Sequence, residues 1–547
     1  MRPVTAFGPD FPFAYDDWLT HPGGLGRLPP EALGREVAVI GAGAAGIVAG
    51  YELMRLGLRP VIYESGRFGG RLRSETFEGS EGVIAELGGM RFPVSSRGFF
   101  HYVDRVGAES APFPNPLTEA AGSTVIDLEG ETVFARTAAD LPPFYAEVAR
   151  AYGRALEEGA RFSDLQAAIR ARDALRIKEI WNPIVRDWDE RTFYDFVASS
   201  EAFRALDFRH REVFGQVGFG TGGWDSDFPN SMLEILRVNL TELDDNQRYI
   251  KGGVEQVLHR LWRHAADCAH WPGGTTLAGL NGGATRSRAV RIAREGADLA
   301  VTDRWGRTDR YGAVLVTCQS HLLTTSIAVD EALFEQKLWM ALDRTRYMQA
   351  AKTFVMVDRP FWKDIDPATG RPLLSMTLTD RITRGTYFFD NGPDRPAVIC
   401  LSYSWMTDAL KVLPHSAEKR VELALAALAK IYPGVDIASH IRGNPICVSW
   451  ESDEDFLGAF KGALPGHYRY NHRMFGHFMQ DGMDPAQRGL FMAGDGVSFT
   501  PAWVEGAVQT ALNAVWGIMN HFGGRSAPEN PGPGDLWQSL GPVALPE

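Results

Sequence analysis

A glycine-rich turn between a strand and a helix constrains the fold of this chain most strongly. Residues 36–40 form a short β-branched run, and Gly41, Gly43 and Gly46 follow directly as G-x-G-x-x-G at the start of a helical pattern. The first glycine makes the tight turn, the second lets backbone approach a pyrophosphate at the helix N-terminus, and the third permits close helix–strand packing. Glu64 ends a second strand-like run about 20 residues further on, where an acid accepts from a ribose hydroxyl. The pattern predicts a β-α-β dinucleotide-binding unit.

The composition is that of an acidic globular protein. The 547 residues are 45% hydrophobic, and 56 basic against 68 acidic residues give a net charge of −12. An acidic chain without a basic block is a poor partner for nucleic acid or anionic lipid. We therefore expect no nucleic-acid partner. The four scattered cysteines form no Cys-x-x-Cys pair and fit a reducing compartment. Neither a signal-peptide pattern nor an apolar run of about 18 residues is present, so we also expect a cytoplasmic protein with no membrane partner.

Other catalytic motifs are missing from the sequence. His467, His472 and His477 are spaced five apart, which puts them on neither one helix face nor one strand face, so no metal site is expected. There is neither a G-x-S-x-G elbow nor a Walker loop.

The segments after Glu64 distinguish FAD from NAD. Residues 65–72 read S-G-R-F-G-G-R-L, and residues 86–93 read E-L-G-G-M-R-F-P. With these motifs the chain resembles the flavin amine oxidase superfamily, in which a Gly-Gly-Arg, here ending in Gly70 and Arg71, continues along the pyrophosphate. The resemblance implies an α/β fold: a Rossmann-like FAD-binding domain of the amine oxidase type, a mixed-sheet substrate domain and a helical substrate-lid region.

The resemblance extends to the far end of the chain. Residues 489–495 read as a strand ending in Gly494 and Asp495, and residues 502–507 open a helix. In the family the acid lies near the pyrophosphate, and the positive end of the helix lies under the flavin pyrimidine edge. Val290 matches a position that contacts the adenine side. The residues that the resemblance assigns to FAD are Gly41, Gly43, Ala45, Gly46, Glu64, Gly70, Arg71, Gly88, Gly89, Met90, Arg91, Val290, Gly494, Asp495, Trp503, Val504 and Ala507.

Several other positions match the reaction site of the family. Lys352 stands alone in an apolar strand, where a lysine is costly unless it has a partner, and it matches the lysine that holds a water at flavin N5. Trp450 and Phe460 match one wall of an aromatic cage, and Trp503 matches the opposite wall. Ala459 stands where some monoamine oxidases attach flavin to a cysteine, so we expect non-covalent FAD.

Arg91 distinguishes an amino acid substrate from a plain amine. A buried arginine needs a partner, and its planar fork suits a carboxylate. Its segment, together with residues 217–223, 233–237 and 503–513, resembles bacterial L-amino acid oxidases and monooxygenases of the tryptophan 2-monooxygenase group, in which the arginine anchors the substrate carboxylate. The resemblance spans residues 10–522. It implies that Arg91, Lys352 and Trp503 are the catalytic residues.

The contacts to the rest of the substrate are less regular. Many relatives have a glycine directly before the cage tryptophan, where this chain has Pro501 and Ala502. In those relatives the backbone carbonyl at this position accepts a hydrogen bond from the substrate amine. Asp225 and Asp227 lie in the region expected to bind the side chain of the substrate. If they contact the substrate, they would suit a basic side chain. If they are simply solvated, an aromatic side chain is equally suitable. The expected substrate-binding residues are Arg91, Phe460, Ala502, Trp503, Asp225 and Asp227.

The expected reaction is FAD-dependent oxidation of an L-amino acid with a large aromatic or basic side chain. A hydride passes from Cα to the flavin, and oxygen is the final acceptor. The product is an amide, formed by oxidative decarboxylation, or a 2-oxo acid with ammonia and hydrogen peroxide. The alternatives are a flavin monoamine or polyamine oxidase and a non-catalytic FAD-binding scaffold. A homodimer is expected from the commonest symmetry of soluble oligomers.

The pattern divides the chain into five parts. The expected parts are an extended lead-in (1–34), a discontinuous FAD-binding domain (35–100, 250–320 and 485–522), a mostly helical substrate region (101–249), a sheet-plus-helix substrate domain (321–484) and a flexible Pro/Gly-rich tail (523–547).

Overall fold

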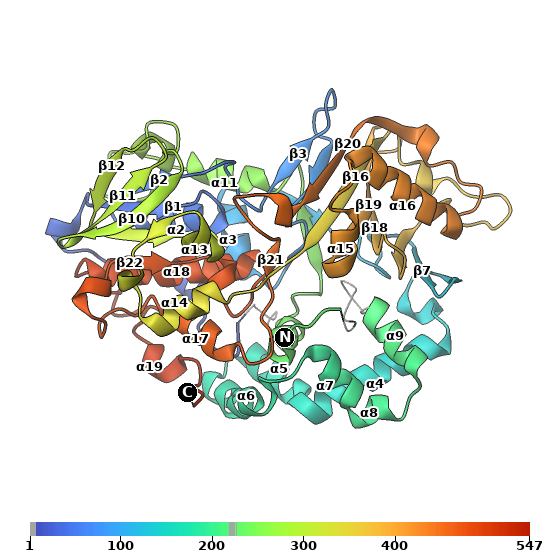
Figure 1. Ribbon diagram of the computed structural model, residues 1–547, viewed down its shortest axis with the longest axis horizontal. Coiled ribbons are helices and arrows are strands. Elements are labelled where there is room, and N and C mark those ends of the chain that lie inside the picture. Colours follow the sequence, from blue (N-terminus) through green and yellow to red (C-terminus); the bar gives the residue numbers. More distant parts are fainter. Residues whose placement is uncertain (1–6, 218–224, 226, 547) are drawn as a thin grey trace.

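The β-α-β unit predicted near the start of the chain forms part of a parallel sheet (Figure 1). The computed structural model describes residues 7–217, 225 and 227–546. The sheet order is β2-β1-β13-β22, and every pair in it is parallel. Its elements are β1 (Glu36–Ile40), α2 (Ala44–Arg55), β2 (Arg59–Tyr63), β13 (Ala313–Val316) and β22 (Leu490–Met492).

Both faces of this sheet are covered, which explains why β1 is apolar from Val37 to Ile40. Val37 and Val39 belong to the core beneath α2 and α18 (Val504–His521), whereas Ala38 and Ile40 belong to a second core beneath an antiparallel sheet. Successive strand residues face opposite ways, so a strand buried on both faces cannot alternate with polar residues. The antiparallel sheet has the order β12-β11-β10-β14 and consists of β10 (Ala289–Glu295), β11 (Asp298–Asp303), β12 (Thr308–Tyr311) and β14 (Ala328–Val329).

A seven-stranded mixed sheet forms the second half of the molecule, with the order β20-β16-β19-β18-β17-β7-β8. The helices α15 (Met406–Val412) and α16 (Ala417–Ile431) pack against β16, β19 and β20. Val355 and Val357 of β16 pack toward the core that includes α16, while Phe354 and Met356 face the main core. The strands are β7 (Thr124–Leu128), β8 (Glu131–Ala135), β16 (Ala350–Val357), β17 (Met376–Thr379), β18 (Gly385–Phe389), β19 (Ala397–Trp405) and β20 (Ile441–Ser449).

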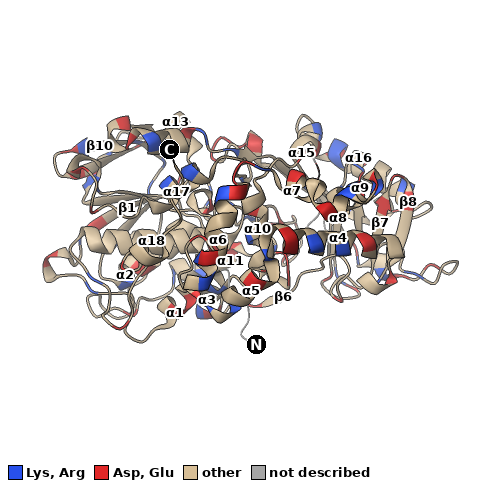
Figure 2. Cartoon of the chain, turned by 90° about the horizontal axis from the view of Figure 1, so that it is seen from below, with Lys and Arg blue, Asp and Glu red and all other residues tan. Residues whose placement is uncertain are grey.

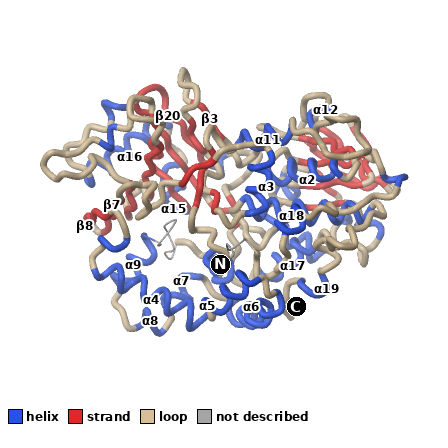
Figure 3. The backbone as a smooth tube through the Cα atoms, turned by 180° about the vertical axis from the view of Figure 1, so that it is seen from behind, coloured by secondary structure: helices blue, strands red, loops and turns tan. Residues whose placement is uncertain are grey.

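A layer of helices runs from the centre of the molecule to below the seven-stranded sheet in Figure 1, and it forms the lower edge in Figure 3. This layer begins at residue 143, later than the expected 101, because β7 and β8 join the seven-stranded sheet through pairing of β7 with β17. The helices are α4 (Pro143–Ala160), α5 (Phe162–Ala171), α6 (Ala174–Trp188), α7 (Phe193–Ser199), α8 (Glu201–Arg204), α9 (Phe208–Val217) and α10 (Met232–Leu240).

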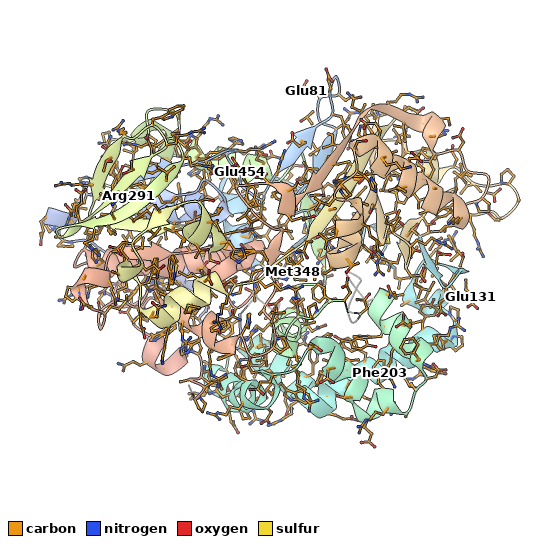
Figure 4. All side chains as sticks on the ribbon, in the orientation of Figure 1. Glu81, Glu131, Phe203, Arg291, Met348 and Glu454 are labelled. Carbon is orange, nitrogen blue, oxygen red and sulfur yellow. The ribbon has the colours of Figure 1, made fainter. Side chains whose placement is uncertain are left out.

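Short elements join these layers. The strand pair β15-β21 lies where the halves meet, and Met348 of β15, labelled in Figure 4, pairs with Phe460 of β21. The short strands are β3 (Ser74–Thr76), β4 (Ile84–Glu86), β5 (Phe92–Pro93), β6 (Ser110–Pro112), β9 (Gln247–Ile250), β15 (Tyr347–Met348) and β21 (Phe460–Lys461). The remaining α-helices among the described residues are α1 (Tyr15–Thr20), α3 (Arg97–Arg105), α11 (Glu255–Trp262), α12 (Leu277–Leu280), α13 (His321–Thr325), α14 (Gln336–Asp343), α17 (Tyr468–Gly476) and α19 (Trp537–Leu540).

The C-terminal tail differs from the expected flexible segment, because it packs against the N-terminal lead-in. Asn530 Nδ2 donates to the carbonyl oxygens of Trp18 (3.0 Å) and Gly24 (2.9 Å). The ring of Trp537 lies 5.3 Å from that of Phe11. A Pro/Gly-rich segment shows no helical pattern in the sequence. It is nevertheless held in place when its aromatic side chains are buried and its polar groups form hydrogen bonds with backbone.

The basic and acidic residues are interspersed along helices, strands and loops, and neither sign is confined to one segment of the chain (Figure 2). Across the described ranges no helix is both long and apolar enough to span a bilayer. In the same part of the chain, no three His, Cys, Asp or Glu side chains gather as metal ligands would.

Candidate active site

A cavity of about 270 Å³ extends from the glycine turn to the meeting point of the two halves. The parallel-sheet unit, the seven-stranded sheet and α10 all contribute to its wall. Most of the predicted cofactor residues line it, while Gly46 and Val290 are not among the lining residues. The predicted cofactor residues that line the cavity are Gly41, Gly43, Ala45, Glu64, Gly70, Arg71, Gly88, Gly89, Met90, Arg91, Gly494, Asp495, Trp503, Val504 and Ala507.

The glycine turn leaves no room for a side chain at Gly41 or Gly46. Gly41 has φ +114°, and a Cβ on Gly46 would lie 1.9 Å from the Gly41 carbonyl oxygen. Gly43 pairs with Gly69 as an isolated bridge, so bare backbone and the N-terminus of α2 face the cavity. Glu64 accepts hydrogen bonds from the amides of Ala42 (2.7 Å) and Gly66 (2.9 Å). This backbone cradle fits the pyrophosphate and ribose of a dinucleotide.

Arg71 connects three segments that are far apart in the sequence. It pairs with Asp495 (Nη2–Oδ1, 2.5 Å) and donates from Nη1 to the Ala459 carbonyl (3.0 Å). Asp495 also accepts from the Ala502 amide (3.1 Å). A Cβ on Gly88 would lie 1.7 Å from the Arg71 carbonyl oxygen, so only glycine permits this approach. The network fixes the loop before α18 against the cradle.

Lys352 is buried in the middle of β16. Its ammonium donates to the carbonyl oxygens of Glu86 (3.0 Å) and Gly88 (2.5 Å) and lies 4.7 Å from the centre of the Tyr403 ring. Burial lowers the pKa of Lys352 from its ordinary value of 10.5 to about 7. A lysine with this environment and pKa is able to exchange a proton near neutral pH.

Arg91 carries an unused hydrogen-bond donor. Its Nη1 is buried and has no hydrogen-bond partner among the described residues. The guanidinium carbon lies 5.8, 5.7 and 5.5 Å from the ring centres of Phe113, Tyr387 and Tyr403. Aromatic faces stabilise a cation but accept no strong hydrogen bond. The arrangement therefore suits an anion that enters from the cavity.

Aromatic side chains form the wall around this end of the cavity. Trp450 donates from Nε1 to the Leu87 carbonyl (3.3 Å), and Trp503 packs against Val238 and Leu243. Trp405 lies edge-on to Phe460, with their ring centres 6.3 Å apart. The lining residues that the sequence interpretation missed here include Phe228, Glu234, Ile235, Val238, Tyr403 and Trp405. Tyr403 and Trp405 alternate at the end of a β-rich run, a signal that could have placed both on one face.

The two acids proposed for the substrate side chain do not line this cavity. Asp225 pairs with Arg384 (Oδ2–Nη2, 3.3 Å), and Asp227 accepts from the hydroxyl (2.9 Å) and amide (3.0 Å) of Thr407. Both line an adjoining cavity, and Phe228, Tyr403 and Trp405 line both cavities. Of the glycine-rich motif of residues 217–223, also singled out in the sequence, only Val217 belongs to the described residues.

Ala502 adopts a backbone conformation that favours glycine, with φ +70°. An alanine there is strained by about 1 kcal/mol. We expect Ala502→Gly to change the free energy of unfolding by less than about 1 kcal/mol, because relief of this strain opposes the greater entropy of the unfolded chain. Ala502→Val should destabilise by more than about 2 kcal/mol, since a β-branched residue is a genuine outlier at this φ. Urea unfolding measures both, and equal losses would contradict the role of φ.

The backbone cradle, the Arg71–Asp495 ion pair and the helix N-terminus facing the cavity fit an FAD-dependent oxidoreductase. Residues 44–519 match the family model described as flavin containing amine oxidoreductase, and the chain belongs to this family. The predicted amine oxidase type of fold is thereby confirmed.

Similar proteins agree with this assignment. The tryptophan 2-monooxygenase of Pseudomonas savastanoi is 29% identical, with 93% of this chain and 94% of the relative covered. An L-amino-acid oxidase of Siganus canaliculatus is 24% identical (90% and 86% covered). Putrescine oxidase bound to putrescine shares the fold with a TM-score of 0.63 at 18% identity (89% and 99% covered). Cyclohexylamine oxidase from Brevibacterium oxydans also has a TM-score of 0.63, at 16% identity (89% and 99% covered).

FAD should leave the protein on denaturation. Ala459, next to Phe460, offers no thiol for a flavin bond. Cys318 lines the cavity, but it interacts electrostatically with Glu64 at the ribose end, and burial raises the pKa of its thiol to about 12. We therefore expect acid precipitation to release all the flavin into the supernatant, as measured by absorbance. Flavin that stays with the pellet and with a tryptic peptide would contradict this.

Proposed function

We propose that the protein oxidises an L-amino acid at its Cα–N bond, with FAD as the electron acceptor and oxygen as the final oxidant. The observation that carries this proposal is that Arg91 lines the cavity, has a buried donor without a hydrogen-bond partner among the described residues and lies among three aromatic side chains. A carboxylate satisfies that donor and neutralises the guanidinium, whereas a plain amine does neither. The names of the similar proteins, tryptophan 2-monooxygenase and L-amino-acid oxidase, support the same substrate class.

The residues around Arg91 would orient the rest of the substrate. The carbonyl of Ala502 would accept from the neutral α-amine, and Phe460 and Trp503 would pack against the substrate on either side. Lys352, hydrogen-bonded at the Glu86 and Gly88 carbonyls, would hold a water beside the reacting atoms. FAD supplies the electron-accepting chemistry, with loss of the Cα hydrogen as a hydride. The protein contributes orientation and exclusion of water.

Two outcomes follow the oxidation. An imino acid that leaves the site hydrolyses to a 2-oxo acid and ammonia, and oxygen is reduced to hydrogen peroxide. An imino acid retained beside the peroxide undergoes oxidative decarboxylation to an amide. We propose that the partition depends on how well the aromatic wall retains the imino acid. Relatives named monooxygenase and oxidase support both branches.

The proposed substrate carries a large aromatic or basic side chain. Phe228, Tyr403 and Trp405 offer aromatic faces at the boundary between the two cavities. A side chain that is long enough to pass between them would reach Asp225, where a cation would compete with Arg384.

Anaerobic flavin bleaching tests the proposal. The holoenzyme is mixed with aromatic and basic L-amino acids and, in parallel, with the matching decarboxylated amines. Bleaching by amino acids alone is the expected result. Equal bleaching by the amines would favour a monoamine or polyamine oxidase, and no bleaching by either panel would favour an FAD-binding scaffold. The best substrate is then re-run in air to compare amide with 2-oxo acid.

We also propose that the enzyme acts as a homodimer in the cytoplasm. The commonest symmetry of soluble oligomers and the sparse cysteines support this. Sedimentation equilibrium at a monomer mass of 60.3 kDa tests the dimer.

A further inference from the structure

Two buried ionisable side chains at and near strand β21 have no role in the reaction described so far. Lys461 follows Phe460 on β21, is 1% exposed, and its ammonium has no hydrogen-bond partner among the described residues. Glu234 projects from α10, is 6% exposed and lines the cavity. A buried ammonium without a hydrogen bond is expensive unless an opposite charge compensates it.

The two side chains compensate each other. The Glu234 carboxylate accepts from the Ala463 amide (2.5 Å) and from the Asn230 side chain. Burial raises its pKa and the charge of Lys461 opposes that rise. Burial likewise lowers the pKa of Lys461, and the charge of Glu234 opposes it. Each charge therefore favours the ionised form of the other side chain in an interior that disfavours both charges.

Other charged groups face the pair without replacing either member. Arg237 of α10 interacts with both side chains, and Asp495 stabilises the Lys461 ammonium. His467, at the start of α17, has its pKa lowered to about 4 by burial and by the charge of Lys461, so it is neutral at pH 7. Arg237 itself is neutralised by Asp10 (Nε–Oδ2, 2.5 Å). Asp495 is likewise paired with Arg71, so the charges that remain to balance each other are those of Glu234 and Lys461.

An amino acid in solution carries an ammonium, whereas loss of a hydride from Cα requires the nitrogen lone pair. We propose that Glu234 accepts the proton that the α-ammonium of the substrate loses, and that Lys461 keeps Glu234 ionised until the substrate binds. This inference deepens the proposed function and rests on it. The N–H bond breaks and its electron pair stays on nitrogen, while the proton forms an O–H bond on Glu234, directly or through water. No electrons leave the substrate in this step.

The other carboxylates that line the cavity lie at the ribose end or face an arginine that engages them. Glu64 accepts from the amides of the glycine turn, and Asp495 has Arg71 and the Ala502 amide on its two oxygens. Asp455 pairs with Arg288, and Asp244 interacts with the charge of Arg91 at the carboxylate end. Among the described residues lining the cavity, Glu234 is the carboxylate on α10, one turn before Val238, which packs against Trp503, and it interacts with the charge of the buried Lys461.

The pH dependence of anaerobic flavin reduction tests this role. Glu234→Gln should slow reduction at pH 7 by about 10²-fold, and the deficit should shrink toward about pH 10, where the substrate amine is already neutral. Lys461→Met should move the acid-side inflection to higher pH, because loss of the cation raises the pKa of Glu234 further. A purely structural role predicts slowing that is equal at every pH, and that result would overturn the proposal.

Asp189→Asn is the matched control. Asp189 is also a buried carboxylate that accepts a backbone hydrogen bond (Tyr468 amide, 3.2 Å), but it does not line the cavity. This variant should keep the wild-type pH profile. The same profile change in Asp189→Asn and Glu234→Gln would assign the effect to a general loss of packing.

Difference infrared spectroscopy detects the proton without turnover. An α-methyl amino acid matching the best substrate has no Cα hydrogen, so it binds without being oxidised. Its binding to the holoenzyme at mildly alkaline pH should produce the carbonyl band of a protonated carboxylic acid in the wild type and not in Glu234→Gln. No band in the wild type would overturn the inference. The proposed function fails separately, if no L-amino acid bleaches the wild-type flavin.

Discussion

Replacing Arg91 with Met is expected to raise the apparent KM for an L-amino acid by about 10²- to 10³-fold. Removing one partner of a buried, hydrogen-bonded charge pair costs about 2–5 kcal/mol, and each 1.4 kcal/mol corresponds to about tenfold. Met keeps most of the side-chain volume against Phe113, Tyr387 and Tyr403. Steady-state kinetics over a wide substrate range measures the change, and the flavin spectrum verifies that FAD is still bound.

The decarboxylated amine is the internal control for this variant. It lacks the carboxylate, so Arg91→Met should oxidise it as fast as the wild type does, or faster. Arg91→Lys should lie between the two, because an ammonium keeps the charge but loses the planar fork that binds both carboxylate oxygens. A KM for the amino acid that stays near the wild-type value would show that Arg91 does not anchor the carboxylate.

Much of the cofactor half of the site could be predicted from the sequence, because local motifs position it. The G-x-G-x-x-G turn, the acid at Glu64 and the Gly-Gly-Arg before Leu72 are each contained within a few residues. Their backbone geometry follows from the absence of side chains: a Cβ on Gly46 or Gly88 would lie less than 2 Å from a carbonyl oxygen. Lys352 could be identified too, because a lone lysine in an apolar strand needs a partner.

The substrate half of the site is built from contacts between residues far apart in the sequence, which local sequence patterns do not predict. Tyr403 and Trp405 reach the cavity because β19 lies beside β16 in the seven-stranded sheet. Glu234 and Lys461 interact electrostatically although they lie more than 200 residues apart in the sequence. Asp225 was expected at the substrate, yet Arg384 holds it in the adjoining cavity. In each case the sequence shows the residue type, whereas the tertiary structure decides its partner.

The C-terminal tail shows a different limit of sequence patterns. Its Pro and Gly residues indicate only that the segment is not a long helix. Whether such a segment is ordered depends on what it can bury. Here Trp537 packs against the ring of Phe11, and Asn530 donates to two backbone carbonyls of the lead-in. These partners lie at the opposite end of the sequence, where no local pattern could indicate them.

Replacing Lys352 with Met is expected to separate activity from stability. Turnover should fall by about 10²- to 10⁴-fold, the contribution typical of a positioned group that handles a proton. The free energy of unfolding should respond in a pH-dependent way. The pKa of Lys352 is about 7 in the folded protein against 10.5 ordinarily, so between these values the unfolded chain binds more protons. Stability contributed by this site therefore rises with pH across that window, by at most about 1.4 kcal/mol per pH unit.

The Met variant lacks this titration, so its stability should rise less between about pH 7 and pH 10 than that of the wild type. Lys178→Met is the matched control. Burial lowers the pKa of Lys178 to about 8, and its ammonium also donates to backbone carbonyls, at Asp10 and Gly541, but it does not line the cavity. That control should flatten the stability profile in the same direction while turnover stays near the wild-type value. Urea unfolding at several pH values, paired with turnover assays, distinguishes the two variants. If Lys352→Met and Lys178→Met lost activity equally, the loss would follow from removing a buried lysine in general, and Lys352 would have no special place at the reacting atoms.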